Sequence, residues 1–446
     1  MAYTPEALQT RLEKLGTQPR YLVAFSGGLD STVLMGSLVR LTDNWSALRL
    51  RAAHVDHGLQ EDSGRWTAHC SEQSSRWDVP FLCSQVVVEK DSPGGPEAAA
   101  RTARYQALAE LLEPGEVLLT AHHRDDQLET VLLNLLRGSG VKGLGGMPEL
   151  ARFGRGFHAR PLLPFRRAEL EDYARGAGLS WLDDPSNADR RFDRNYLRHE
   201  VLPLLERRWP SAATTVGRNA LHIQDAARLL DALAEADLAR VGDAESLSVG
   251  RLRMLDVARQ RNLLRHWIAG LELPVPGSVV LEIIRDVLEA RSDSEPKVCW
   301  PGAEVRRYGD RLYAMTPLPP VPSGVVGTLT GAGPCELPAP FGTLRITAAD
   351  TGPRLKHACA ENGFKVRFRT GGEKLRLPGR EHRHVVKKLF QDKGVLPWMR
   401  QRLPFLYVGD RLAAVADLWV DAGFAADSGE RGYRVVWEHH PPVHRR

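Results

Sequence analysis

A buried strand that runs directly into a glycine-rich loop and then into a helix constrains the fold of this chain most. The run Tyr21–Phe25 is apolar throughout, as in strands that are covered on both faces of a sheet. The heptad S-G-G-L-D-S-T at 26–32 follows, and apolar residues continue at helical spacing from Val33 to Leu41. Glycines allow a tight turn, and free N–H groups at a helix start attract phosphate. The heptad lacks the lysine of a Walker A loop and the spacing of a Rossmann turn. The sequence therefore predicts a phosphate-binding loop of another type.

Further apolar runs alternate with helical stretches along the first 150 residues. Runs near Leu50–Val55, Phe81–Val88 and Glu116–Ala121 read as strands, with helices near Ser63–Trp77 and Glu97–Leu112 between them. This alternation predicts an α/β fold with a doubly wound parallel sheet, in which ligands bind at the carboxyl ends of the strands.

The rest of the chain predicts three further parts. We expect an α/β catalytic domain over 1–211, a helical domain over 212–320, a Pro/Gly-rich connection over 321–350 and a small basic α+β domain over 351–446. Residues 351–446 hold nineteen Lys/Arg against ten Asp/Glu, a net charge of +9, although the whole chain carries only +5. Such a module indicates a polyanionic partner, and on charge alone a solvated surface explains it equally well.

Composition excludes several classes of protein. The hydrophobic fraction of 43% and the charged fraction of 26% are ordinary for globular chains, which argues against a disordered or fibrous protein. The five cysteines form no C-x-x-C pair, so neither a zinc knuckle nor a dithiol site is indicated. The sequence shows no membrane-length apolar run and no secretory signal. The expectation is a soluble, cytoplasmic protein without a membrane partner.

Two polar clusters accompany the loop. Asp126 and Glu129 follow the fourth predicted strand and share one helix face, where two carboxylates could bind an ammonium group, hold Mg²⁺ or accept a proton. For Asp125 we favour helix capping. Arginines at 104 and 194 could clamp phosphates or carboxylates, although ion pairing on a helix surface is the simpler explanation of either alone.

Taken together, the motifs resemble one family within the PP-loop ATP pyrophosphatases, the tRNA(Ile)-lysidine synthetases. The resemblance rests on S-G-G-L-D-S at 26–31, H-V-D-H-G-L at 54–59, A-A-R-T-A-R-Y at 99–105, H-H-R-D-D-Q-L-E-T at 122–130, R-G-S-G at 137–140, D-D-P-S-N…R-N-Y-L-R at 183–198, R-T-G-G-E at 369–373 and K-K-L-F at 387–390. It spans nearly the full length and is weakest over about 212–345.

The resemblance implies a reaction. The family ligates L-lysine to carbon 2 of the wobble cytidine in the CAU anticodon of tRNA(Ile). The reaction uses ATP and Mg²⁺, passes through an adenylated cytidine, and releases AMP and pyrophosphate. The product, lysidine, changes codon specificity from AUG to AUA and amino-acid identity from Met to Ile.

The resemblance also assigns roles to residues. The pyrophosphate of ATP would be held by Ser26, Gly27, Gly28, Leu29, Asp30 and Ser31, with Asp30 as the Mg²⁺ contact. Lysine is protonated at neutral pH, so a carboxylate must position its ammonium group and take the proton; Asp126 is the first candidate and Glu129 the second. Arg194 or Arg104 would bind the lysine carboxylate or a phosphate, a choice the sequence leaves open.

The basic final domain would hold tRNA away from the anticodon, at the acceptor stem in the family. The candidates are Arg367, Arg369, Lys374, Arg376, Lys387 and Lys388. The resemblance also raises a homodimer as an expectation. Three alternatives stay open here: a PP-loop enzyme that thiolates tRNA, which would carry paired cysteines; an amidotransferase-type ligase, which would carry a glutaminase module; and a non-catalytic RNA-binding protein, which would not turn over ATP.

Overall fold

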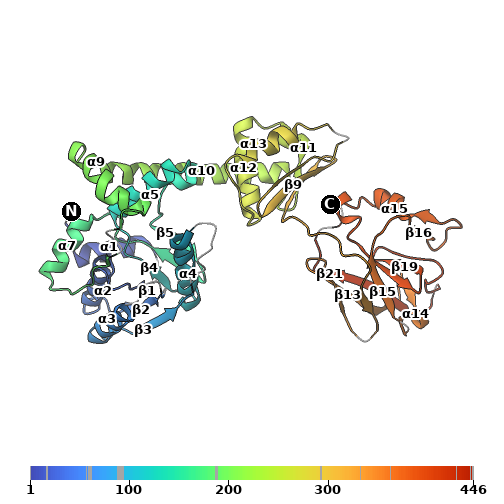
Figure 1. Cartoon of the computed structure of the whole chain (residues 1–446), viewed down its shortest axis with the longest axis horizontal. Coiled ribbons are helices and arrows are strands. Elements are labelled where there is room, and N and C mark those ends of the chain that lie inside the picture. Colours follow the sequence, from blue (N-terminus) through green and yellow to red (C-terminus); the bar gives the residue numbers. More distant parts are fainter. Residues whose placement is uncertain are drawn as a thin grey trace. The chain divides into compact units, whose positions relative to one another are not determined.

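The computed structural model of the chain forms two compact units, Met1–Leu233 and Ala234–Arg446 (Figure 1). It describes residues 2–16, 19–56, 58, 63–87, 95–185, 189–291, 294–331, 333–361, 363–427, 429–441 and 443.

The first unit is built on a six-stranded sheet with the order β3-β2-β1-β4-β6-β5. The strands are β1 (Arg20–Ala24), β2 (Arg49–Asp56), β3 (Phe81–Gln85), β4 (Val117–Leu119), β5 (Leu150–Phe153) and β6 (Gly156–Ala159). All neighbouring pairs are parallel except β5 and β6, which form an antiparallel hairpin. The predicted parallel α/β sheet is confirmed, and the edge hairpin is an addition to it.

Strand β1 is apolar on both faces because helices cover both sides of the sheet. Tyr21 and Val23 belong to one core and Leu22 to the other, and all three side chains are fully buried. Helix α2 packs in the first core, where Leu34 is fully buried, and α4 contributes Leu108 to the second. The helices of this unit are α1 (Pro5–Lys14), α2 (Leu29–Leu41), α3 (Ser63–Arg76), α4 (Gly95–Leu111), α5 (Arg124–Leu136), α6 (Val141–Leu144), α7 (Arg167–Gly176), α8 (Asp193–Tyr196), the π-helical turn η2 (Leu197–Val201), α9 (Leu202–Arg208) and α10 (Ala212–Val241), which runs on into the second unit.

The stretch expected to be helical over 212–320 also contains a four-stranded antiparallel sheet with the order β7-β10-β9-β8. Its elements are β7 (Leu247–Ser248), α11 (Val249–Arg253), α12 (Val257–Gly270), α13 (Val279–Glu282), the π-helical turn η3 (Ile283–Leu288), β8 (Lys297–Trp300), β9 (Ala303–Tyr308) and β10 (Arg311–Met315). The purely helical prediction is therefore wrong for this part. The sequence feature that points to the sheet is Gly309-Asp310, the two-residue turn between β9 and β10. Gly309 has φ +58°, which is typical of hairpin turns.

The stretch expected to be a connection, 321–350, instead supplies strands to the C-terminal sheets. Leu329, Phe341 and Leu344 in it are fully buried in the core. Its prolines and glycines lie in the turns between short strands and do not form a linker.

The C-terminal sheets have the orders β11-β15-β18-β19-β20 and β12-β13-β21-β14, with a small β16-β17 pair. The elements are β11 (Val325–Leu329), β12 (Cys335–Glu336), β13 (Thr343–Ala349), β14 (Leu355–Lys356), α14 (His357–Glu361), β15 (Phe364–Phe368), β16 (Lys374–Leu375), β17 (His384–Val385), α15 (Val386–Asp392), the 3₁₀ turn η4 (Pro397–Met399), β18 (Pro404–Val408), β19 (Arg411–Val415), β20 (Trp419–Val420) and β21 (Gly432–Glu438). The α+β character expected of this end of the chain is present. Among the described residues, no helix is both long and apolar enough to cross a bilayer.

Candidate active site

The predicted phosphate-binding loop lies between β1 and α2. Gly27 has φ +77°, a left-handed conformation that favours glycine, and Gly28 is the N-cap of α2. A Cβ atom on Gly27 would lie 2.9 Å from Cys70 Sγ and 3.2 Å from His69 Cδ2. Both backbone conformation and space therefore require glycine at 27. The Nδ1 atom of His54 lies 3.0 Å from the Phe25 carbonyl oxygen, so β2 supports the start of the loop.

Side chains of the loop form a small polar cluster. Ser26 Oγ lies 3.0 Å from Ser31 Oγ, and the Ser31 hydroxyl donates to the Gly28 carbonyl at 3.0 Å. The Oδ1 atom of Asp30 is buried without a hydrogen-bond partner among the described residues. Burial raises the pKa of Asp30, and His123 partly opposes that shift. A buried carboxylate oxygen without a donor suits a hard cation.

The predicted carboxylate pair lies at the start of α5, beyond the end of β4. His123 caps this helix: its backbone N–H donates to Asp126 Oδ2 at 2.9 Å, and its ring accepts the Asp126 N–H. Asp125, which we expected to cap this helix, instead accepts the backbone N–H of Arg167 at the start of α7. Glu129 is fully buried one turn further on.

Two arginines neutralise the pair. Arg194 donates from Nε to Glu129 Oε2 at 2.6 Å and from Nη2 to Asp126 Oδ1 at 2.9 Å. Arg198 donates from Nε to Glu129 Oε1 at 2.7 Å and from Nη2 to Asp126 Oδ1 at 3.1 Å. Burial opposes ionisation of Asp126, but His123 and Arg194 outweigh it and hold the pKa of Asp126 well below its usual range. The four side chains form a hydrogen-bonded ion cluster in which the two carboxylates are buried and the two guanidinium groups are partly buried.

Arg198 was not singled out from the sequence, although it stands in the quoted motif. Its signal is the spacing of four residues from Arg194, which places both guanidinium groups on one helix face. Their partners lie 65 to 72 residues earlier, so no local pattern could show the contact.

Arg104 on α4 takes a different place. Burial lowers the pKa of Arg104, and Arg194 contributes to the same shift. Its guanidinium carbon lies 5.4 Å from the ring centre of Tyr105. Within the described part of the chain no carboxylate forms an ion pair with it, in contrast to Arg194.

The loop and the carboxylate pair meet at His123. Its Nε2 atom lies 3.8 Å from Asp30 Oδ2 and 3.3 Å from Asp126 Oδ2. The structure thus brings Asp30, Asp126, Glu129 and Arg194 together near the carboxyl ends of β1 and β4. Among the described residues, no three or more His, Cys, Asp or Glu side chains are grouped so that they could hold a metal ion.

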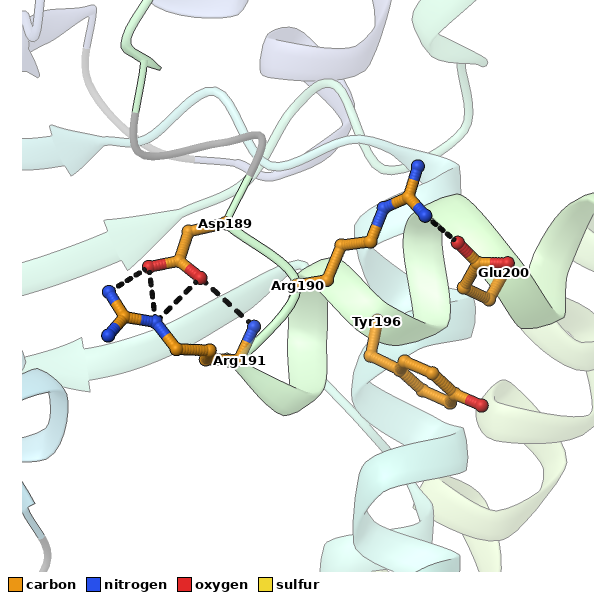
Figure 2. A pocket seen from close by; sticks show the side chains of 5 residues that line it. All are labelled: Asp189, Arg190, Arg191, Tyr196 and Glu200. Atoms are coloured by element: carbon orange, nitrogen blue, oxygen red, sulfur yellow. Dashed lines mark hydrogen bonds and ion pairs between the residues drawn. The ribbon is translucent and has the colours of Figure 1, made fainter.

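Tyr196 of α8 and four residues close to it in sequence line an open hollow of about 780 Å³ (Figure 2). Figure 2 shows Arg190 paired with Glu200 and Arg191 paired with Asp189 beside the half-exposed ring of Tyr196. These side chains form ion pairs of their own and do not join the cluster at Asp126. The residues His57, Leu59, Ser186 and Asn187 of the quoted motifs lie outside the described residues.

The six basic candidates of the C-terminal domain divide into two groups. Lys374, Arg376, Lys387 and Lys388 are exposed. Arg367 and Arg369 are half-buried: Arg367 lies over the ring of Tyr407, and Arg369 donates from Nε to Glu373 at 3.2 Å. The side chains of the first group are exposed to a polyanion in solution, whereas those of the second already contact other side chains of the domain.

Comparison with protein families gives three matches along the chain. A PP-loop domain matches residues 4–205, a TilS substrate binding domain matches 247–313, and a TilS substrate C-terminal domain matches 364–437.

Curated relatives match over nearly the whole length. The tRNA(Ile)-lysidine synthase of Alkalilimnicola ehrlichii is 43% identical over 442 residues, 98% of each chain. That of Coxiella burnetii is 39% identical over 443 residues, 99% of this chain and 97% of the relative. Among solved structures, a U34-tRNA thiolase from Methanococcus maripaludis is 16% identical with a TM-score of 0.42, covering 50% of this chain and 78% of that one, which is too low to bear on function.

Proposed function

We propose roles for the described residues in the reaction of the tRNA(Ile)-lysidine synthases. This chain belongs to that family. As a member, the chain has tRNA(Ile)-lysidine synthase activity, acts on tRNA(Ile) as a ligase, and uses ATP through its PP-loop domain. One observation supports the assignment of residues most: His123 links Asp30 of the phosphate loop with Asp126 of the carboxylate pair.

In the first step the oxygen on carbon 2 of the wobble cytidine attacks the α-phosphorus of ATP, and the bond to pyrophosphate breaks. Backbone N–H groups at 27–31 and the hydroxyls of Ser26 and Ser31 would hold the leaving pyrophosphate. They lie at the N-terminus of α2, where N–H groups and the helix dipole favour an anion. The unpartnered Oδ1 of Asp30 would hold Mg²⁺ together with ATP phosphates. When bound, that cation supplies charge neutralisation for the pyrophosphate.

In the second step the ε-amine of lysine attacks carbon 2, AMP leaves, and the amine loses a proton. The carboxylates of Asp126 and Glu129 would bind the lysine ammonium beside the loop. The low pKa of Asp126 makes it a strong anchor for a cation and a weak proton acceptor while Arg194 and Arg198 stay in place. Asp126 remains our first candidate acceptor and Glu129 the second, with the arginines displaced as lysine enters.

Arg104 is the better candidate for the carboxylate of lysine or for a phosphate. Arg194 already donates to two carboxylates, whereas Arg104 has no such partner among the described residues. A half-buried guanidinium without a carboxylate partner favours an incoming anion. The homodimer, the cytoplasmic location and the domain boundary at 211 stay predictions.

The assignment is tested by incorporation of labelled lysine into a tRNA(Ile) transcript with a CAU anticodon, in the presence of ATP and Mg²⁺. We expect ATP-dependent labelling of this tRNA and none of tRNA(Met). Asp126→Ala should lower lysine incorporation at least 100-fold while pyrophosphate release at saturating ATP persists. Asp225→Ala, which removes an exposed carboxylate paired with Arg228, is the matched control and should leave both rates unchanged. Equal labelling by the Asp126 variant would overturn the assignment.

A further inference from the structure

A row of buried polar side chains leads from β6, the strand between β4 and β5, to the candidate active site, and the reaction as proposed does not use it. Thr120 Oγ1 lies 2.8 Å from His122 Nδ1 on one side and 2.8 Å from His158 Nε2 on the other. His158 Nδ1 in turn lies 3.1 Å from Arg160 Nη2. Thr120, His158 and Arg160 are buried, whereas His122 is partly exposed at the carboxyl end of β4.

Arg160 sets the direction of each hydrogen bond in this row of side chains, from Arg160 to His122. A guanidinium only donates, so His158 Nδ1 accepts and carries no proton. Burial first, and then Arg160, lowers the pKa of His158 to about 3, so the ring is neutral and its proton is on Nε2. That Nε2–H donates to Thr120 Oγ1.

Because Thr120 Oγ1 accepts from His158, its own hydroxyl proton is free to be donated to His122. Its hydroxyl proton needs an acceptor because the side chain is buried. In the described structure the acceptor within reach is His122 Nδ1. Burial lowers the pKa of His122 well below its usual value, and Arg160, Arg194 and Arg104 add to the shift against Asp126. His122 is therefore neutral, with its one proton on Nε2.

A neutral histidine with its proton fixed on Nε2 can donate a hydrogen bond from that nitrogen, while the lone pair of its Nδ1 is occupied by the Thr120 hydroxyl. The charges of Asp126, Arg194 and Arg104 act on the His122 ring. The lysine and the activated cytidine are expected beside these same residues. Negative charge develops there on the phosphate of the adenylated cytidine when AMP leaves. No hydrogen bond of His122 Nε2 is found among the described residues.

We propose that His122 is a further catalytic residue, which donates from Nε2 to a phosphate oxygen of the adenylated cytidine, and that Thr120, His158 and Arg160 are positioning residues that keep the proton on that nitrogen. This inference rests on the adenylated intermediate of the proposed function. It separates two roles: the carboxylates handle the lysine ammonium, and His122 stabilises the departing AMP.

The tautomer is measured first, because it does not depend on activity. We expect the ¹⁵N spectrum of the full chain labelled at histidine, near pH 7, to show His122 with a pyridine-like Nδ1 and a pyrrole-like Nε2, identified by the signals absent in His122→Gln. Thr120→Val should mix the two tautomers of His122, and Thr120→Ser should keep one. A protonated Nδ1 in the wild type, or a single unchanged tautomer in folded Thr120→Val, would overturn the proposal.

Kinetics then distinguish a donor from a base. His122→Ala should lower the rate of lysidine formation by about 100-fold, the usual loss for one donor to a developing anion. The amide N–H of His122→Gln lies near the position of Nε2 and should restore at least one tenth of the wild-type rate. If His122→Gln is as inactive as His122→Ala, or if His122→Ala is fully active, the donor role is wrong. Failure of the wild type to label tRNA(Ile) would instead refute the proposed function and leave the tautomer result standing.

Discussion

At the scale of single residues, the centre of the candidate site is a cluster of two buried acids and two partly buried arginines. Glu129 is fully buried, and both of its oxygens accept hydrogen bonds from Arg194 and Arg198. Removing one partner from a buried ion cluster costs far more than the intact cluster contributes, because the remaining charges are left without compensation.

We therefore expect Glu129→Gln to lower the free energy of unfolding by about 3–5 kcal/mol. The exposed pair of Arg228 and Asp225 provides the contrast, since Asp225→Asn should change the same quantity by about 1 kcal/mol or less. Urea denaturation of the three proteins measures both values. Equal losses in the two variants would mean that the cluster is accessible to water and is not a buried network.

At the scale of secondary-structure elements, the strand-loop-helix unit was predictable because its requirements are local. An apolar strand covered on both faces, a left-handed Gly27 and a helix start at Leu29 all leave their signature within ten residues. The contact of α5 with η2, the turn that follows α8 and carries Arg198, has no local signature, so Arg198 was missed.

Elements of the second unit were mispredicted for a related reason. Strand β9 carries Glu304, Arg306 and Arg307, whose charges are satisfied by neighbours such as the Glu304–Arg306 pair. Charged residues in a strand hide the alternation that predicts it. In the stretch 321–350, prolines and glycines fit both a linker and the turns between short strands, and burial alone distinguishes the two.

The loop itself gives a test at this scale. Gly27→Ala places a methyl group against Cys70 Sγ and in a left-handed conformation, so the loop must shift. We expect ATP binding, measured by calorimetry, to weaken at least 10-fold. Gly217→Ala, in α10 where a Cβ meets no atom within 4 Å, should leave ATP binding unchanged. An unaltered affinity in Gly27→Ala would show that the loop does not grip ATP.

At the scale of the whole molecule, positive charge is concentrated in the C-terminal domain, while the first 350 residues carry a net negative charge. The lysines of α15 are exposed, whereas the guanidinium groups of Arg367 and Arg369 pack over the rings of Tyr407 and Phe390. Exposed cations that meet phosphates release counterions, so their contribution depends on salt.

We expect the affinity for tRNA(Ile) to fall with salt, and the slope of its logarithm against that of the salt concentration to become shallower by about 0.7–1 in Lys387→Ala and again in Lys388→Ala. Filter binding over a salt series measures these slopes. Arg76→Ala, which removes an exposed arginine of α3 paired with Glu72, serves as the control. Identical slopes in all variants would place the tRNA contacts elsewhere.

The pairing of Asp126 and Glu129 with arginines has a further consequence for a ligase that couples an amine to RNA. Any side chain that fills an amine-binding site in the resting state stands next to an activated carbon. A lysine there would carry the same primary amine as the substrate and would compete to become joined to the tRNA. The guanidinium groups of Arg194 and Arg198 stay protonated at every physiological pH and are not nucleophilic. In the proposed site, Asp126 and Glu129 are thus neutralised by groups that cannot cross-link the enzyme to its own RNA.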